Sequence, residues 1–337
     1  MKKCLFYYGN NDVDDQLSNN PSKINLHSQW ITLRQKLNDS GIILLSQKNL
    51  GSETPDLEIH LNAWKKRDTN CPKYSILADC KFIHPNNVNI NLLKTYNQIF
   101  SWDNSLINLG LATKIQMAHP LGSGVVDGFK DRNHLLVLFG SNRSLRGWYP
   151  KNNLYSERVK TIKWFEANAI SDFKLYGKKW NMSGRLPTRL GAFVHSVEKR
   201  LPFKYCPFPS WQGTVPDKQE ILKKSRFSIV YENVKGINGY ISEKIFDAFV
   251  AGNIPVYWGA NDIEKYISAD CFINRNNYKN HDDLYKYLKN MTEERYLVYQ
   301  NNIKNFLVNH SSDFTCENFG NIISSNIIKN LKKLEYA

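Results

Sequence analysis

Short apolar runs alternate with helical patterns along the first part of the chain. Runs at 5–8, 42–45, 57–61, 74–78 and 98–102 are bounded by polar or turn residues, as is typical of strands. Between the first two, apolar residues recur at helical spacing over 28–37 and stop before a glycine, which predicts a helix. Strands that alternate with helices predict parallel sheets with helices on both faces.

The second part repeats the alternation more regularly. The apolar runs at 135–139 and 173–176 predict strands, and the spacing over 155–168 predicts a helix between them. The segment 226–258 predicts a strand, a helix and a strand, at 226–231, 242–251 and 254–258. From about 281 onward the pattern is mostly helical. The glycine-rich segment 121–128 is typical of a linker. The chain is therefore expected to form an α/β protein with domains at 1–128 and 129–310 and a helical tail at 311–337.

The charge of the chain leaves several kinds of ligand open. The 337 residues include 45 Lys and Arg against 31 Asp and Glu, a formal net charge of +14. Such an excess suits nucleic acid, an anionic membrane or anionic small ligands such as sugar nucleotides. The basic residues are dispersed, and no helix-turn-helix, zinc-finger or RNP-like segment is evident. A nucleic-acid-binding protein is therefore the weaker alternative.

Targeting signals and cysteines point to a cytoplasmic protein. No segment approaches the roughly 18–20 apolar residues that a membrane helix needs. The first residues lack the apolar core of a signal peptide. Six scattered cysteines show no metal-ligand spacing, so we expect reduced thiols. Three lysines of the tail, Lys329, Lys332 and Lys333, lie near the apolar residues Ile327, Ile328 and Leu331, which suggests peripheral contact with the inner membrane face. The alternative is a helix whose apolar side packs on the first domain.

The segment after the strand 226–231 carries the chemistry. Glu232 and Asn233 follow that strand, and ligands of open parallel sheets bind just beyond the carboxyl ends of strands. Ser242 is the expected N-cap of the next helix. The unpaired N–H groups and partial positive charge at the N-terminus of a helix suit a diphosphate.

The side chains around that helix N-terminus suit a nucleotide. Lys244, in the first turn, is unfavourable next to the positive end of the helix dipole unless an anionic ligand offsets its charge. Glu243 is placed to accept hydrogen bonds from ribose hydroxyls, and Tyr240 to bond a phosphate oxygen.

The same segment resembles the signature of the α1,3/1,4-fucosyltransferase family, in its bacterial, GDP-fucose-dependent form. That signature is a strand ending in Glu-Asn, a glycine-containing loop, Tyr-x-Thr-Glu-Lys and a Pro-Val/Ile-Tyr-Trp-Gly strand. Here its parts stand at 232–233, 239–244 and 255–259, with Ser242 where Thr is usual. Weaker resemblance covers most of the chain, including 208–213.

The resemblance implies a GT-B-like fold of two facing Rossmann-like domains, in which the second domain binds the donor. Its phosphate-binding arginine falls on Arg158, and its Ser-Asn pair on 141–142, with Arg143 where Lys is commoner. The donor-binding residues implied are Asn142, Arg158, Lys218, Glu232, Asn233, Tyr240, Glu243 and Lys244.

The general base of the family falls in the first domain. Family members carry Glu near the end of a strand, ahead of a Pro and an Asn. Here the strand 74–78 is followed by Asp79 and then by Ile83-His-Pro-Asn86. We therefore expect Asp79 to remove the acceptor proton. His84, Glu58 and His119 are held in reserve for this role.

The implied reaction moves L-fucose from GDP-β-L-fucose to a hydroxyl of an acceptor glycan, with inversion to an α1,3 or α1,4 linkage. The expected acceptor sugar is GlcNAc in a LacNAc-type or lipopolysaccharide-like glycan. No cofactor or essential metal is expected, because cationic side chains stabilise the departing GDP. Asp12-Val-Asp14 fits the Asp-x-Asp string of metal-dependent transferases, which leaves a metal site as an alternative. A related transferase for another nucleotide sugar is the nearest alternative, and the oligomeric state stays open.

Overall fold

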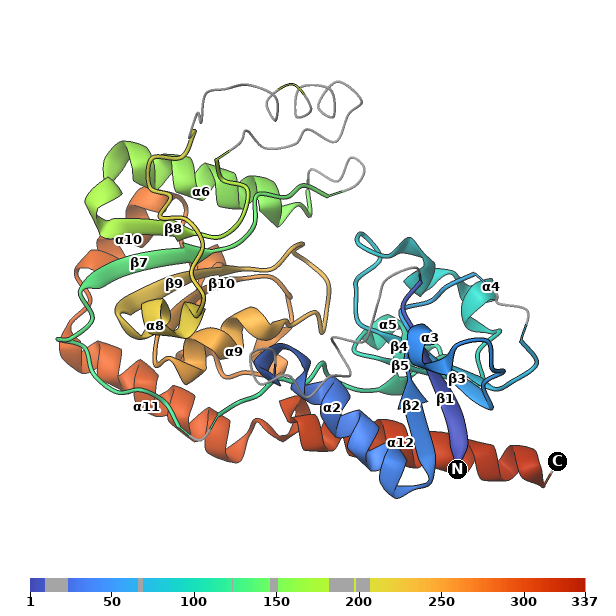
Figure 1. Cartoon of the computed structure of the whole chain (residues 1–337). Helices are drawn as coiled ribbons and strands as arrows, with labels where there is room; N and C mark the ends of the chain where they lie inside the picture. The colour runs from blue at the N-terminus through green and yellow to red at the C-terminus, as the bar shows by residue number, and fades with distance from the viewer. Residues whose placement is uncertain are drawn as a thin grey trace. The chain divides into compact units, whose positions relative to one another are not determined.

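The chain forms two compact units, each built around one parallel sheet (Figure 1). The computed structural model describes residues 1–9, 24–65, 69–122, 124–145, 151–181, 197 and 207–336. The first unit comprises residues 1–121, 238–240 and 311–337, and the second comprises 122–237 and 241–310. Residues 311–337, expected as a separate tail, thus group with the first unit.

The sheet of the first unit contains all five strands predicted there. Its order is β2-β1-β3-β4-β5-β6, and every pair of neighbours is parallel. The strands are β1 (Lys2–Tyr7), β2 (Ile42–Leu45), β3 (Leu57–Leu61), β4 (Lys73–Leu77), β5 (Gln98–Ser101) and β6 (Thr113–Lys114). The short helices are α3 (Gln47–Leu50), η2 (Pro85–Val88), α4 (Ile90–Leu93), α5 (Asn104–Asn108) and η7 (Ser312–Phe314). Strand β6 was missed because two polar residues give no apolar run.

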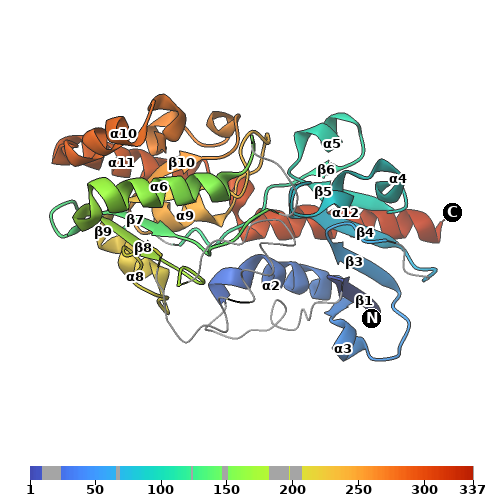
Figure 2. The same ribbon diagram turned by 90° about the horizontal axis from the view of Figure 1, so that it is seen from above.

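Helices α2 (Ile24–Asp39) and α12 (Cys316–Glu335) lie side by side and cover this sheet (Figures 1 and 2). Gly320 permits the close approach, since a Cβ there would lie 3.2 Å from Cγ2 of Thr32. Ile327 and Leu331 belong to the same buried cluster as the apolar side of α2 and the strands. Ile327 and Leu331 thus pack in the core of the first unit, as the alternative predicted, while peripheral membrane contact stays a prediction.

The sheet of the second unit has the order β11-β10-β9-β7-β8 and is also parallel throughout. The strands are β7 (His134–Phe139), β8 (Phe173–Tyr176), β9 (Ser225–Tyr231), β10 (Ile254–Trp258) and β11 (Ile273–Asn274). The helices are α6 (Leu154–Asn168), η3 (Ile170–Asp172), α8 (Lys218–Lys223), α9 (Glu243–Val250), η4 (Ile263–Lys265), η5 (Ala269–Cys271), η6 (Arg275–Asn277), α10 (His281–Lys289) and α11 (Glu293–Asn309).

Both faces of this second sheet are buried. Leu136 and Leu138 of β7 pack in the cluster that includes α6, whereas Val137 packs with Leu222 of α8 on the opposite face. Figure 1 shows the sheet between α6 and α10 on one side and α8 and α9 on the other. Continuous apolar strands are what a sheet buried on two faces requires.

Arg132 attaches the predicted linker to the second unit. Its guanidinium is 2% exposed and donates to backbone carbonyls of the linker and of three other segments. The acceptors are Gly128, Val126, Leu222, Ser225 and Ala251, at 2.7–3.3 Å. A buried cation needs such complete hydrogen bonding. The segment 124–128 is therefore held by specific contacts.

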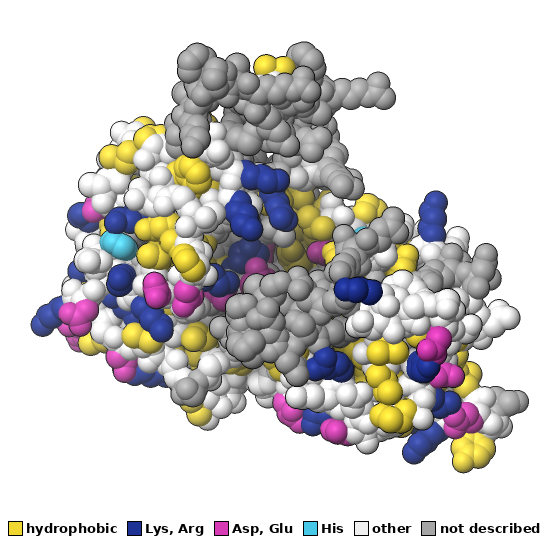
Figure 3. Space-filling view, viewed as in Figure 1, with side chains coloured by type: hydrophobic (Ala, Val, Ile, Leu, Met, Phe, Trp, Pro, Cys, Tyr) yellow, Lys and Arg dark blue, Asp and Glu magenta, His cyan; other side chains and the backbone are white. Residues whose placement is uncertain are grey.

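Charged side chains are interspersed over the surface. Figure 3 shows Lys and Arg in several separate groups, with Asp and Glu between them. An extended basic stripe is typical of a protein that tracks a nucleic-acid backbone. The face in view shows no such stripe. Among the helices that the structure describes, none combines the length and the apolar character needed to cross a bilayer.

Candidate active site

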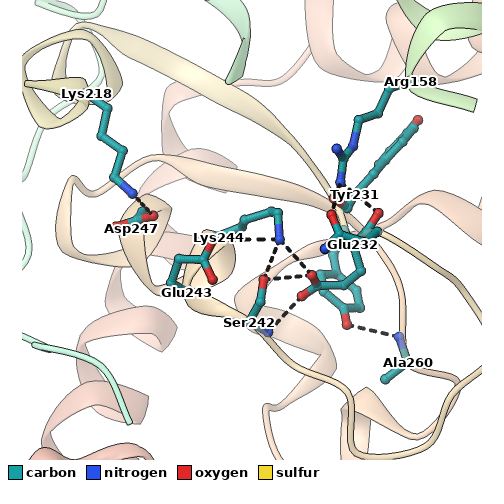
Figure 4. A network of polar contacts seen from close by, with 11 residues as sticks. Arg158, Lys218, Tyr231, Glu232, Ser242, Glu243, Lys244, Asp247 and Ala260 are labelled. Atoms are coloured by element: carbon teal, nitrogen blue, oxygen red, sulfur yellow. Dashed lines mark hydrogen bonds and ion pairs between the residues drawn. The ribbon is translucent and has the colours of Figure 1, made fainter. Parts of the chain in front are cut away.

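A buried carboxylate organises the carboxyl end of β9. Glu232 has no exposed surface. Its Oε1 accepts a hydrogen bond from the backbone N–H of Ser242 at 2.9 Å. Its Oε2 accepts from the Ser242 hydroxyl at 2.6 Å and from Lys244 Nζ at 3.0 Å (Figure 4). Both carboxylate oxygens are therefore used to hold the start of α9, which makes Glu232 a positioning residue for Lys244.

Gly259 provides the space for that carboxylate. A Cβ at this position would lie 2.5 Å from Cγ of Glu232 and 2.4 Å from the hydroxyl oxygen of Tyr257. The Tyr257 hydroxyl in turn accepts a hydrogen bond from the N–H of Ala260 at 3.0 Å. The sequence motif contains both Tyr257 and Gly259, but their contact with Glu232 depends on how β9 and β10 pair. The glycine directly after Trp258 could have indicated a close approach of another side chain at this position.

Ser242 stands at the N-cap position of α9 with extended backbone, as predicted, but its side chain makes no capping hydrogen bond. The prediction of a hydroxyl cap is wrong because the hydroxyl bonds Glu232 and accepts from Lys244 Nζ at 2.7 Å. The first-turn N–H groups of α9 are thus left without a cap from Ser242. Such groups favour an anion at this end of a helix.

Lys244 keeps its positive charge in a partly buried place. Burial by itself would lower the pKa of Lys244, but the carboxylates of Glu232 and Glu243 outweigh it, so the pKa is raised. Glu243 lies 3.7 Å away and is largely exposed. The Arg158 guanidinium acts on the same pKa in the opposite direction, so the two cations are near enough to interact. Two cations beside one buried carboxylate and an uncapped helix end attract an anionic group.

Arg158 joins this cluster through the first turns of α6. The side-chain oxygen of Asn153 caps α6 and sets its start at Leu154. One turn later, Nη2 of Arg158 donates to the carbonyls of Tyr231 at 2.6 Å and Glu232 at 2.8 Å. It also lies 3.3 Å from Oδ1 of Asn233. Arg158 is 5% exposed, so it fixes the end of β9 as well as adding charge there.

The other predicted donor residues lie outside this cluster. Lys218 forms an ion pair with Asp247, to one side of the Glu232 contacts (Figure 4). Burial raises the pKa of Asp247 to about 6, although Lys218 opposes the shift. Asn142 is buried after β7, where its N–H donates to the carbonyl of Lys178 at 3.0 Å. Tyr240 groups with the first unit.

The ring of Tyr240 packs against an aromatic residue of that first unit. Its centroid lies 5.1 Å from that of Trp102. The predicted contact of Tyr240 with a phosphate oxygen stays a prediction. The structure brings together Arg158, Glu232, Asn233, Glu243 and Lys244.

Asp79 directly follows β4, at the carboxyl edge of the first sheet. Its Oδ2 accepts a hydrogen bond from Nδ2 of Asn62 at 2.9 Å. Burial raises the pKa of Asp79, while the Asn62 hydrogen bond and the His84 charge oppose that rise. A carboxylate with a raised pKa at a strand end is suited to general-base chemistry. Asn62 gave no signal in the sequence, because a lone Asn after a strand is a common turn residue.

The reserve candidates for the base differ in their access. Glu58 has no exposed surface, and its carboxylate bonds His60 Nε2 at 2.6 Å and the Thr69 hydroxyl at 2.9 Å. It therefore cannot meet an acceptor sugar. His84 lies near Asp79, with Nε2 donating to the carbonyl of Ala63 at 2.7 Å. His119 donates its backbone N–H to Phe314.

The metal alternative falls outside the described part of the chain. Asp12 and Asp14 both lie in the range 10–23, which the structure does not describe. Among the residues that it does describe, no three His, Cys, Asp or Glu side chains gather to hold a metal ion. The cluster around Glu232 itself contains two cations, Lys244 and Arg158.

Comparison with known proteins shows the family for the part of the chain that contains Arg158, Glu232 and Lys244. The model of glycosyltransferase family 10 (fucosyltransferase), C-terminal part, matches residues 156–335, more than half of the chain. An α-(1,3)-fucosyltransferase of Helicobacter pylori is 37% identical over 75 residues, which cover 22% of this chain and 16% of that protein. Human 4-galactosyl-N-acetylglucosaminide 3-α-L-fucosyltransferase 9 is 39% identical over 101 residues, 28% of each chain. These matches thus span less than a third of the relatives.

Solved structures resemble the whole chain in fold. An α-glucosyltransferase in complex with UDP and DNA aligns with a TM-score of 0.57 and 12% identity, covering 98% of this chain and all of that one. The Anabaena protein HepE with UDP and glucose gives a TM-score of 0.55 at 12% identity, covering 97% and 99%. An α1,3-fucosyltransferase with GDP-fucose gives 0.46 at 14% identity, covering 89% and 81%. The prediction of a GT-B-like α/β fold is confirmed. By its sequence match from α6 to α12, the chain belongs to glycosyltransferase family 10, the fucosyltransferases.

Proposed function

We propose that this protein is an inverting fucosyltransferase that moves L-fucose from GDP-β-L-fucose to a hydroxyl of an acceptor glycan. The observation that carries the proposal is the Lys244–Glu232–Ser242 cluster, which lies within the matched family segment. An ammonium group held by a buried carboxylate next to a helix N-terminus is preorganised for a diphosphate leaving group.

Some of the proposed donor residues bind the nucleotide, and others stabilise the negative charge that develops on the leaving diphosphate. Lys244 and Arg158 neutralise the diphosphate as the bond to fucose breaks, and Glu232 keeps Lys244 in place. Glu243 is exposed in the first turn of α9, where its carboxylate accepts hydrogen bonds from the ribose. Asn233 adjoins Arg158 and completes the polar edge of β9. Asn142, Lys218 and Tyr240 stay in the proposed donor set on the resemblance alone.

The proposed reaction is a single displacement. The acceptor hydroxyl oxygen attacks C1 of fucose on the face opposite GDP, and the bond between C1 and the β-phosphate oxygen breaks. Asp79 takes the proton of the hydroxyl, and GDP leaves with the bonding electron pair. The β-linked donor thereby gives an α-linked product. Asp79 belongs to the first unit, whereas the cluster of Lys244, Glu232 and Arg158 belongs to the second.

The acceptor class follows the relatives. The human relative is named for transfer to galactosyl-N-acetylglucosaminide, and we propose an N-acetylglucosamine hydroxyl in a LacNAc-type or lipopolysaccharide-like glycan, in α1,3 or α1,4 linkage. The test incubates the chain with GDP-fucose and an array of galactose- and N-acetylglucosamine-containing acceptors. Product linkage and anomeric configuration are read by NMR. A β-linked product would contradict the inverting mechanism.

The donor sugar is tested against a specific alternative. Both solved structures reported above with TM-scores above 0.5 are described with UDP, so the panel includes UDP-glucose and other GDP- and UDP-sugars. We expect transfer from GDP-fucose in preference to all others. Efficient transfer from a UDP-sugar would assign the same cluster to another nucleotide sugar.

The metal requirement is tested on the same assay. Because Lys244 and Arg158 supply the positive charge in the proposal, we expect activity to survive EDTA. Complete loss that added Mg²⁺ or Mn²⁺ restores would assign a role to Asp12 and Asp14.

A further inference from the structure

Asn62 has an unusual backbone conformation beside Asp79. It follows β3 with φ of 67°, and among the described residues only Lys179 is another non-glycine with positive φ. Its side chain is 1% exposed. Asn is one of the residues that tolerate this left-handed region, yet such positions cluster at functional sites. The conformation turns the Asn62 amide toward the end of the neighbouring strand β4.

The amide of Asn62 engages Asp79 through both of its polar atoms. Nδ2 donates to Oδ2 of Asp79 at 2.9 Å. Oδ1 accepts from the backbone N–H of Asp79 at 2.9 Å and from that of Ala78 at 3.1 Å. One side chain thus fixes the backbone and the carboxylate of Asp79 together. Oδ1 of Asp79 accepts no hydrogen bond from the described residues, whereas Oδ2 is committed.

A second buried amide holds Asn62 in this orientation. Asn87 is 3% exposed, and its Nδ2 donates to Oδ1 of Asn62 at 2.8 Å and to the carbonyl of Asp79 at 2.7 Å. Its own Oδ1 accepts from the N–H of Ala63 at 2.9 Å. Because Oδ1 of Asn62 accepts three N–H groups, its Nδ2 must point at Asp79. The amide orientation is therefore determined by the network.

We propose that Asn62 is a positioning residue that orients the Asp79 carboxylate, so that Oδ1 of Asp79 receives the acceptor proton. The proposal rests on the proposed function, in which Asp79 is the base. A hydrogen bond donated to the ionised carboxylate also favours the form that can accept a proton. Asn62 thus contributes both geometry and charge state without contacting substrate.

Other titratable groups near Asp79 interact electrostatically with its carboxylate. The His84 charge favours the ionised form, whereas Tyr8 and Cys80 each interact electrostatically with the Asp79 carboxylate and are disfavoured as anions by it. Tyr8 and Cys80 are neutral near pH 7, because a phenol and a thiol ionise only above this pH and burial raises both pKa values further. The acid limb of the activity profile therefore reports the pKa of Asp79, on which the Asn62 hydrogen bond and the His84 charge both act.

Two substitutions distinguish the hydrogen bond that Asn62 donates to the Asp79 carboxylate from the hydrogen bonds that it accepts from the backbone. Asn62→Asp keeps an oxygen that accepts the backbone N–H groups but places a carboxylate against Oδ2 of Asp79. Asn62→Gly keeps the positive φ and removes the amide altogether. Asn70→Asp is the matched control, since Asn70 is exposed ahead of β4, at the opposite end of that strand from Asp79. Transfer from GDP-fucose to a LacNAc-type acceptor is measured from pH 5 to 9 on the full chain.

We expect kcat to fall about tenfold or more in both Asn62 variants while KM for GDP-fucose stays unchanged, since the loss is a hydrogen bond to a charged group. The acid limb of kcat/KM should move to higher pH, further for Asn62→Asp because like charges raise a carboxyl pKa. Asn70→Asp should match the unsubstituted chain. Thermal unfolding and GDP binding verify that each variant folds. If Asn62→Asp does not fold, Asn62→Gly decides.

An acid limb and kcat equal to those of the unsubstituted chain in a folded Asn62→Gly protein would overturn the positioning role. A fall in kcat with an unmoved acid limb would also overturn it, because a merely structural defect acts in that way. Failure of the proposed base has a different signature, which is full activity of Asp79→Asn. The two failures are therefore distinguishable in one set of proteins.

Discussion

The ammonium group of Lys244 lies 3.0 Å from Oε2 of Glu232, a carboxylate that has no exposed surface. From the sequence, the charge of Lys244 was expected to be unfavourable at this helix end unless an anionic ligand offset it. The structure shows that Glu232 already balances its charge and that Ser242 bonds both partners. An anion at the helix end thus meets a lysine whose position is fixed before binding, which lowers the cost of ordering it.

Glu232→Gln should destabilise the second unit. The substitution keeps the shape but leaves the Lys244 charge without its buried partner. We expect a loss of about 3 kcal/mol in the free energy of unfolding, at the lower end for breaking a buried pair, because Lys244 retains some exposure. Urea unfolding measures it. The pair also predicts pH dependence: since the pKa of Lys244 is raised in the folded state, its contribution is present at neutral pH and lost as the pH rises through that raised value. If Glu232→Gln lost as much stability on going from neutral to alkaline pH as the unsubstituted chain does, this account would be contradicted.

Lys244→Ala should lower kcat/KM for transfer from GDP-fucose by about 10²–10³-fold, the usual effect of losing one preorganised group that stabilises leaving-group charge. Steady-state kinetics measure it. Lys223→Ala, an exposed lysine of α8, is the control and should leave transfer unchanged. A fully active Lys244→Ala protein would remove the donor site from this cluster.

Asp79→Asn should lower turnover by about 10²–10⁴-fold, since it removes basicity while keeping size and polarity. GDP-fucose affinity, measured by calorimetry, should barely change, because Lys244 and Arg158, which neutralise the diphosphate in the proposal, belong to the second unit. Asp79→Glu should retain measurable activity. Because burial raises the pKa of Asp79, the activity should decline with falling pH at values above the usual range of an aspartate. Should Asp79→Asn remain active, His84 becomes the next candidate.

Gly259→Ala should displace Glu232, because the added methyl group would lie 2.5 Å from its Cγ. We expect a loss of about 1–3 kcal/mol in stability from overpacking and a parallel loss of transfer. Gly124→Ala is the matched control, since a Cβ at Gly124 meets nothing within 4 Å. Thermal unfolding and transfer kinetics are measured on both variants. Equal stability and equal transfer rates would show that β9 and β10 shift to accommodate the added methyl group at little cost.

Ile323→Ala in α12 should cost about 2–5 kcal/mol in stability, as a large-to-small change in a core. Leu334→Ala, on the exposed side of the same helix, should cost little. Deletion of 311–337 should unfold the first unit. The membrane hypothesis for α12 would be supported by two results together. The chain without 311–337 would stay folded and transfer fucose, and the intact chain would co-sediment with anionic vesicles.

Most elements of the fold could be predicted from the sequence, because their signals are local. The strand 227–231, its end at Glu232 and the helix from Glu243 depend on apolar runs, polar interruptions and a glycine stop. The family signature covers the same segment, so its resemblance and the local pattern agree. Asp79 was likewise predicted at the end of its strand, and the structure places it there.

Only the tertiary structure decided what these side chains contact. That Glu232 binds Lys244, that Gly259 makes room for it and that Asn62 holds Asp79 all depend on the pairing of strands distant in the chain. The partner of the apolar face of α12 was undecided for the same reason. An amphipathic sequence shows which face of a helix is apolar but not what that face packs against. Local sequence sets backbone conformation through short-range sterics and hydrogen bonds, whereas the partner of a buried polar group is chosen by the packing of the whole unit.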